Sequence, residues 1–151
     1  MSHVTDVKLR ITNLDALAEA ADKCGLVLMR DQKTYTWYGH FVGDSASYGN
    51  IPIEDFGKSA HALRLKDHKR GDYEIGLHTA KDGEGFQVVF DSWGPGQKLA
   101  AAVGLKANTL RREYAAAVAS RKATETLARK GWRVVREDLP GNQIRLRLRH
   151  R

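Results

Sequence analysis

The fold class is decided by residues 73–91, which read YEIGLHTAKDGEGFQVVFD. Apolar residues stand at every second position over 73–77 and again over 86–90. This period of two is typical of half-buried β-strands. Between the two runs lies Lys81-Asp82-Gly83-Glu84, a composition that favours a hairpin turn. The stretch therefore predicts two antiparallel strands joined by a short turn.

Further strands are expected on both sides of this hairpin, because similar apolar patterns recur along the chain. The run just before it, residues 62–66, would extend the hairpin to a three-stranded antiparallel meander. The other expected strands cover residues 4–11, 26–29, 34–38, 132–137 and 143–150.

Two main helices interrupt the strands. The first is expected to begin at Thr12, with Asp15 three residues on as in a capping box, and to stop at Gly25. The second spans about residues 106–130, and a short helical piece is expected at 97–103. Strands and helices do not alternate as in a doubly wound sheet. The prediction is an α+β fold, an antiparallel sheet with two main helices packed on one face, in the order β-α-β-β-β-β-β-α-β-β.

Residues 40–60 break this rhythm, because glycines and a proline interrupt a polar stretch. Such a composition predicts a long loop or insertion, and loops of this length are often functional or mobile. The chain is otherwise expected to form a single domain over residues 1–151, with 40–60 as its least protected part.

The composition is that of an ordinary globular domain, with 42% hydrophobic and 28% charged residues. The single cysteine, Cys24, excludes an internal disulfide, and its place at an apolar helix end predicts a buried, inert thiol. No apolar run approaches the roughly 20 residues of a membrane span. A cytoplasmic location is therefore expected.

Positive charge is concentrated near the C-terminus. Residues 1–104 carry 12 Lys/Arg and 14 Asp/Glu, whereas residues 105–151 carry 13 Lys/Arg and 4 Asp/Glu. Such asymmetry suggests an anionic partner, and a solvated basic surface is the plainer alternative.

The last expected strand separates arginines from aliphatic residues. Ile144, Leu146 and Leu148 share one side, which is expected to face a core, while the arginines occupy the other side about 7 Å apart. Guanidinium groups pair well with phosphate and with carboxylate. An arginine face that deters pairing of sheet edges is the alternative. The candidate residues for an anionic partner are Arg145, Arg147 and Arg149 on this strand and Arg111, Arg112, Arg121 and Lys122 on the long helix.

The corner after residue 90 is a second candidate site. Asp91 and Trp93 stand together before Gly94, and could form the rim of a small-ligand pocket or simply plug the edge of the sheet. His3 could lie near that corner, since a histidine changes charge near neutral pH.

Sequence patterns for catalysis and cofactor binding are missing. The six histidines lack metal-ligand spacing, and the glycines form no phosphate or dinucleotide loop. No nucleophile is accompanied by a base. We therefore expect no catalytic residues, no metal and no cofactor, and an enzyme is the least favoured class.

Taken together, several of these motifs resemble a family of uncharacterised proteins. They are Ser2-His3 before the first strand, a helix ending at Gly25, the strand at 73–77, the run GFQVVFDSWG at 85–94, a helix holding Tyr114, and Gly131 followed by a final strand after Gly141. The family is typified by a conserved hypothetical chloroplast reading frame, with cyanobacterial, bacterial and phage relatives. The resemblance implies a domain of unknown function and an accessory role beside an AAA-type ATPase. It also adds Tyr114 to the candidate ligand-binding residues.

The leading hypothesis is a non-enzymatic accessory protein that uses its basic C-terminal face to bind an anionic partner, either nucleic acid or an acidic protein. The alternative is a small-ligand or nucleotide-binding protein with a pocket near Asp91–Gly94 and the 40–60 loop.

Overall fold

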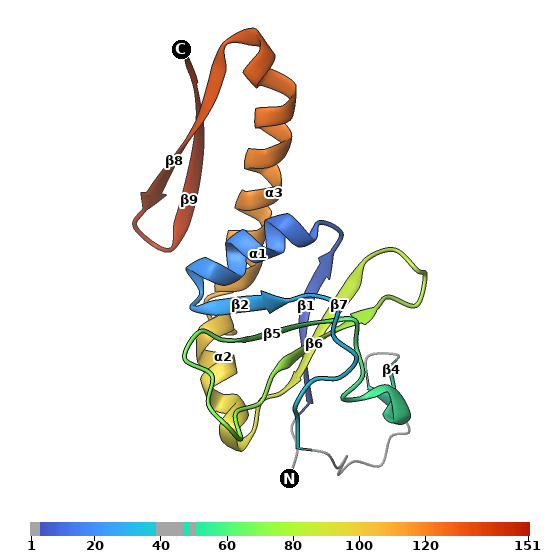
Figure 1. The fold of residues 1–151 in the computed structure, drawn as a ribbon. Coiled ribbons are helices and arrows are strands. Elements are labelled where there is room, and N and C mark those ends of the chain that lie inside the picture. The colour runs from blue at the N-terminus through green and yellow to red at the C-terminus, as the bar shows by residue number, and fades with distance from the viewer. Residues whose placement is uncertain (1–3, 39–46, 49–50) are drawn as a thin grey trace.

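The protein has the expected α+β architecture. A computed structural model describes residues 4–38, 47–48 and 51–151. Its main sheet has five strands in the order β1-β7-β6-β5-β2, and every neighbouring pair is antiparallel. The strands are β1 (Val4–Ile11), β2 (Leu26–Met29), β5 (His61–Leu65), β6 (Ile75–Thr79) and β7 (Phe86–Asp91). The predicted meander is therefore confirmed as β5-β6-β7, with β1 added beside β7 (Figure 1).

Three helices lie against one face of this sheet. They are α1 (Leu14–Lys23), α2 (Gln97–Val103) and α3 (Thr109–Leu127). The cap of α1 is Asn13, whose side chain accepts a hydrogen bond from the Ala16 amide, so the start predicted at Thr12 was wrong by one residue. The predicted stop at Gly25 is confirmed by its left-handed φ of +75°. The core between helices and sheet includes the fully buried Leu17, Leu63, Leu77, Phe90, Leu99 and Leu110.

The opposite face of the sheet carries a smaller apolar cluster. Tyr35 packs directly onto Gly76, where a β-carbon would lie 2.3 Å from the tyrosine ring, so only glycine fits in this strand. The Tyr35 hydroxyl is 2.7 Å from Nε2 of His78 in the same strand. Residues 34–38 therefore cover the sheet rather than extend it. The strand predicted there was wrong, because only an isolated bridge joins Thr34 to Lys58.

The region predicted as a loop at 40–60 is partly described. The two-residue strands β3 (Ser47–Tyr48) and β4 (Ile51–Pro52) pair with each other, and a 3-10 turn η1 (Ile53–Asp55) follows. Ile51 and Phe56 are buried against Val89 on the sheet. The described end of this segment is thus packed by apolar side chains, and the rest of it lies outside the described residues.

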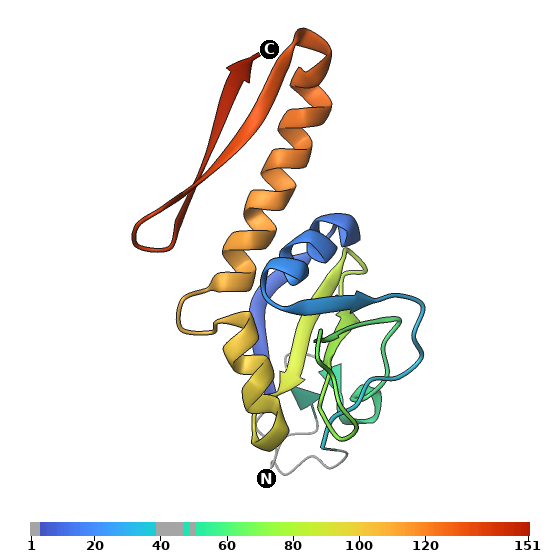
Figure 2. The same ribbon diagram turned by 60° about the vertical axis from the view of Figure 1, so that its left-hand side comes forward.

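The C-terminal part of the chain projects from this body (Figures 1 and 2). Helix α3 continues past α1, a 3-10 turn η3 (Ala128–Lys130) ends it, and β8 (Trp132–Leu139) and β9 (Gln143–His150) run back along the helix as a two-stranded hairpin. We call residues 121–151 the arm. This hairpin is a sheet of its own. The expectation that Ile144, Leu146 and Leu148 face a buried core was therefore wrong: the first two are half-buried and Leu148 is 48% exposed.

Candidate anionic-partner interface

The two faces of the arm hairpin carry different side chains, and the register of its strands shows which residues share a face. Cross-strand partners include Arg133 with Arg149, Val135 with Arg147 and Glu137 with Arg145. Because side chains alternate along a strand, these residues share one face. The other face carries apolar side chains and points toward α3, where Ile144 and Leu146 line a groove beside the helix. We call the arginine-bearing side the outer face.

The outer face holds four arginines and one glutamate. The Glu137 carboxylate lies 3.6 Å from Arg145, 3.1 Å from Arg147 and 4.0 Å from Arg149. All three arginines are about half exposed, so these ion pairs are screened by water and stabilise the hairpin little. Arg133 stands opposite Arg149, an arrangement of like charges that destabilises a hairpin. The predicted arginine face is therefore present, with an excess of positive charge that folding does not require.

A separate arginine fixes the hairpin to the helix. The Arg136 guanidinium donates to both oxygens of Glu113 on α3, at 2.6 and 2.9 Å. It also donates to Asp138 at 2.7 Å. The hydrogen bonds that Arg136 donates to Glu113 and Asp138 raise its pKa, so it is charged at every physiological pH. Sequence reasoning missed this residue, because its partner lies 23 positions away on another element.

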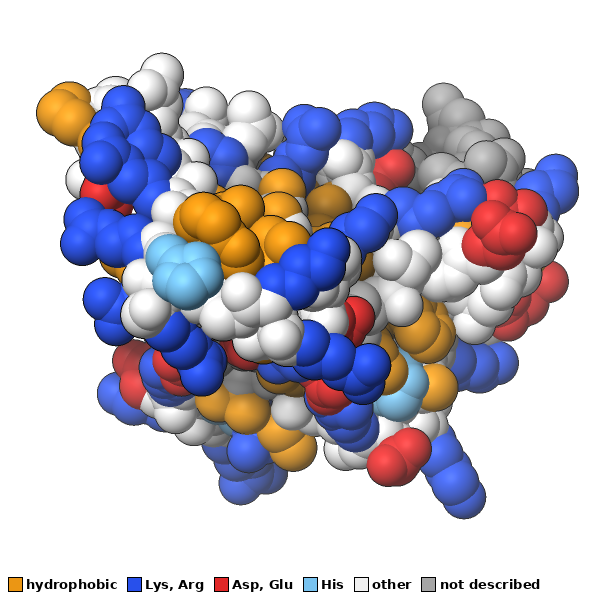
Figure 3. Space-filling model, turned by 90° about the horizontal axis from the view of Figure 1, so that it is seen from above, with side chains coloured by type: hydrophobic (Ala, Val, Ile, Leu, Met, Phe, Trp, Pro, Cys, Tyr) orange, Lys and Arg blue, Asp and Glu red, His pale blue; other side chains and the backbone are white. Residues whose placement is uncertain are grey.

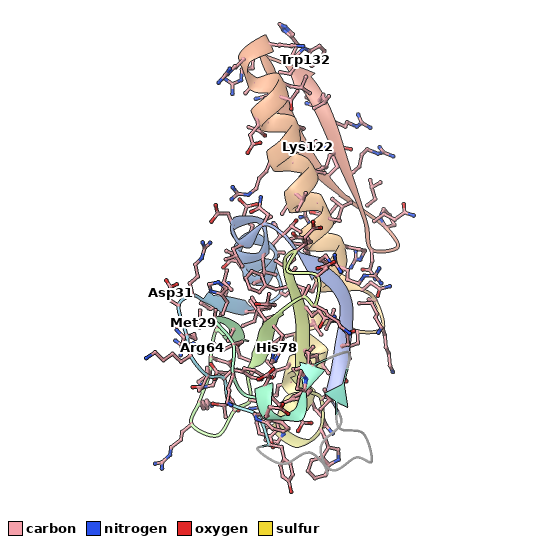
Figure 4. The ribbon with its side chains drawn as sticks, turned by 90° about the vertical axis from the view of Figure 1, so that its right-hand side faces the viewer. Met29, Asp31, Arg64, His78, Lys122 and Trp132 are labelled. Atoms are coloured by element: carbon pink, nitrogen blue, oxygen red, sulfur yellow. The ribbon has the colours of Figure 1, made fainter. Side chains whose placement is uncertain are left out.

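The predicted basic residues of α3 have different surroundings, and Arg112 lines the same groove as Arg145 of the hairpin. Arg112 donates to the carbonyl oxygens of Ala107 and Asn142 and thereby holds the hairpin turn near the start of the helix. Arg121 is paired with Glu19 of α1. Arg111 lines a small hollow beside β1. Lys122 is exposed on the arm, where Figure 4 labels it between the body and Trp132 at the tip.

Of the predicted ligand-binding residues, Asp91 and Trp93 contact each other and Tyr114 lies apart from them. Asp91 is 1% exposed at the end of β7, and it accepts a hydrogen bond from the Trp93 amide at 3.0 Å. Trp93 is 42% exposed. Tyr114 is buried, and its hydroxyl accepts from the amides of Thr12 and Asn13 at 2.9 and 3.2 Å. Asp91 pairs with Val4, at the opposite end of β1 from Thr12, and an eight-residue strand spans roughly 25 Å.

These contacts give the two residues structural roles. Tyr114 ties α3 to the junction of β1 and α1, and Asp91 fixes the turn that leads into α2. His3 lies outside the described residues. The structure thus does not bring Asp91, Trp93 and Tyr114 together into one pocket.

A hollow does exist on the other face of the sheet. It has a volume of about 220 Å³ and is lined by Ile51, Pro52, Asp55, Lys58, Ser59, Ala60, Leu77, His78 and Thr79. Burial lowers the pKa of His78 to about 4, so this imidazole is neutral at pH 7. The hollow places one acidic, one basic and two hydroxyl side chains beside a neutral histidine.

Two other features of the described residues bear on chemistry. They contain no cluster of three His, Cys, Asp or Glu side chains that could hold a metal ion. Burial raises the pKa of the Cys24 thiol to about 11, which disfavours the reactive thiolate.

Comparison with known proteins adds no relative. No family model, no curated protein and no solved structure matches the chain. In the part of the chain that the structure describes, no helix is long and apolar enough to cross a membrane. The resemblance to the chloroplast reading-frame family therefore stays a prediction.

Proposed function

We propose that this chain is a non-enzymatic binding protein whose basic arm docks an anionic partner, a nucleic acid or an acidic protein. One observation carries the proposal. The arm has 10 Lys/Arg and 3 Asp/Glu, whereas residues 1–120 have 15 of each, so the arm holds the whole formal net charge of +7. A positive surface of this kind attracts and orients polyanions.

The shape of the arm supports the same proposal. Its hairpin stands away from the body in Figures 1 and 2, so a long partner can reach the outer face without meeting the sheet. Arginines at alternate strand positions are about 7 Å apart, which suits successive phosphates of one strand or a row of carboxylates. We propose that the protein acts in the cytoplasm. The family resemblance suggests that its partner belongs to an assembly that includes an AAA-type ATPase.

The test is a fluorescence-anisotropy titration of labelled duplex DNA, single-stranded RNA and poly-glutamate at several salt concentrations. The variant Arg145→Gln/Arg147→Gln/Arg149→Gln should bind about ten- to a hundredfold more weakly at low salt. For duplex DNA its salt slope should be shallower by up to about 0.9 per lost phosphate contact.

The matched control removes the same charge from the body. Lys33, Arg70 and Lys81 are exposed there, and their change to Gln should leave affinity within about twofold. Equal losses in the two triple variants would contradict the proposal, as would a wild-type protein that binds none of the three polyanions at low salt.

The hollow beside His78 supports a second candidate function, the binding of a small polar ligand or nucleotide. Its carrying observation is the group Asp55, Lys58, Ser59 and His78 around one cavity. ATP, AMP and inorganic phosphate should then raise the Tm of the protein, and Lys58→Gln should abolish the rise. A Tm unchanged by all three compounds would count against this function.

A further inference from the structure

A groove runs between helix α3 and strand β9, on the side of the hairpin away from the outer face. Its volume is about 750 Å³. The lining residues are Arg112, Ala115, Ala116, Ala119, Leu139, Asn142, Gln143, Ile144, Arg145 and Leu146.

The groove exists because the helix presents short side chains to the hairpin. Ala115, Ala116 and Ala119 face Ile144 and Leu146 across it, and Ala115 and Ala119 are exposed. A helix usually buries an apolar stripe of larger side chains against its neighbour. Alanine side chains do not fill the space, so the aliphatic faces of helix and hairpin are left partly open to water.

The open apolar surface continues toward the tip of the arm. Leu148 is 48% and Trp132 is 37% exposed on the same hairpin face. Figure 3 looks down on this tip and shows hydrophobic side chains gathered in a patch, with Lys and Arg side chains around it. A contiguous apolar patch rimmed by polar residues is the usual mark of an interaction site.

The charge around the groove indicates what occupies it. Arg112 and Arg145 stand at its rim, and Arg112 is held in place by the carbonyl oxygens of Ala107 and Asn142. A second copy of this arm would bring another net charge of +7 against the first, so like charges would oppose self-association. Nucleic-acid bases stack on aromatic side chains, whereas the apolar side chains that line the groove are all alanine, isoleucine or leucine.

From these observations we infer that the groove binds an amphipathic, acidic α-helix of a partner protein. The partner's apolar side chains, spaced i, i+3, i+4 and i+7, enter the groove, and its acidic flank meets Arg112 and Arg145. This inference rests on the proposed function, and it specifies that the anionic partner is a protein with an amphipathic helix. It adds a site on the inner side of the arm to the arginines of the outer face.

The probe is a synthetic fluorescein-labelled peptide with leucine at those spacings and glutamate at most other positions. The control peptide has the same composition in scrambled order, so it keeps the charge but has no apolar face. Binding of both to the full chain is measured by anisotropy, and helix formation by far-UV circular dichroism. The patterned peptide should bind at least about tenfold more tightly than the scrambled one and should gain helix on binding.

Two variants locate the binding. Ala119→Leu fills the groove without changing charge or helix propensity much, and should weaken the patterned peptide at least about tenfold while leaving poly-glutamate binding unchanged. Ala101→Leu, at an exposed position of α2, is the matched control and should bind as wild type.

The outcomes separate the two proposals. Equal binding of patterned and scrambled peptides, or equal binding by wild type and Ala119→Leu, would overturn the groove inference and leave the proposed function standing. A protein that binds neither peptide and none of poly-glutamate, duplex DNA and single-stranded RNA at low salt would overturn both. Retained circular dichroism and Tm in Ala119→Leu show that the variant is folded.

Discussion

The body of the protein and its arm differ in both charge and burial. The body, residues 4–120, has balanced charges and fully buried side chains such as Leu17, Leu63 and Phe90. The arm carries the whole net charge of +7, and among its described residues none is buried. Since a domain is stabilised mainly by apolar burial, the body supplies the stability. The arm exposes charge and apolar surface together, which is the composition expected of a docking element.

The largest difference is expected when one leucine is truncated in each region. Leu63→Ala in the body should lower the free energy of unfolding by about 2–5 kcal/mol, because it opens a cavity in a closed core. Leu148→Ala in the arm should cost less than about 1 kcal/mol, because half of that side chain is already in water. Urea unfolding of both variants measures the values, and similar costs would contradict the division into body and arm.

The body should also respond to mild acid. Burial lowers the pKa of His78 to about 4, whereas an unfolded histidine titrates near 6.5. The unfolded state therefore takes up a proton first, and stability falls as the pH drops through 6.5 toward 4. Between pH 7 and pH 5 the loss should be about 2 kcal/mol.

This pH dependence has its own control. The variant Tyr35→Phe/His78→Leu removes both members of the buried pair, and its free energy of unfolding should change much less over the same interval. If the free energy of unfolding falls equally with pH in wild type and variant, a group other than His78 titrates in this interval.

Within the arm, the arginine that binds the hairpin to α3 should matter for stability, and an arginine of the outer face should not. Arg136→Ala leaves the Glu113 carboxylate, whose side chain is 11% exposed, without its guanidinium, and should cost about 1–2 kcal/mol. Amide exchange in β8 and β9 should become faster, because the hairpin loses its attachment to α3. Arg133→Ala on the outer face is the control and should change stability by no more than about 0.5 kcal/mol. Identical exchange in the two variants would argue against the Arg136 attachment.

The smallest effect concerns Glu137, which competes with any anionic partner for three arginines. Glu137→Gln should raise the affinity for poly-glutamate and duplex DNA by about two- to fivefold at low salt, since it removes one negative charge from the outer face. Anisotropy titrations compare it with Glu125→Gln, an exposed glutamate of α3. Weaker binding by Glu137→Gln would mean that the glutamate mainly orders the arginines.

The sequence contained enough information for the sheet and for the arginine face, because alternation decides which residues share a side of a strand. It did not reveal what covers that side. Ile144, Leu146 and Leu148 have the pattern of a core strand, yet they pack beside the alanines of α3 and are left half open. The pattern of the strand does not show that the helix residues packed against it are alanines, because that contact is formed only in the folded protein.

Two other misses have similar causes. The alternation around Tyr35 suggested a strand, but the tyrosine ring packs on Gly76 and the segment covers the sheet instead. Tyr114 was grouped with Asp91 as a ligand-binding residue. Its hydroxyl instead accepts hydrogen bonds from two backbone amides just after the C-terminal end of β1. Both contacts join residues more than 40 positions apart, so they depend on the folded arrangement and not on neighbouring sequence.

The central claim is that an anionic partner binds the arm and the side of α3 that faces it, and leaves the sheet of the body free. The most direct measurement is a set of ¹⁵N–¹H NMR spectra of the labelled protein, titrated at low salt with poly-glutamate and, in a second sample, with a short duplex DNA. We predict that amide shifts change for residues 121–151 and for the facing side of α3, while those of β5, β6 and the segment 51–60 stay constant. Changes centred on the hollow beside His78, or spread evenly over the body, would contradict the account.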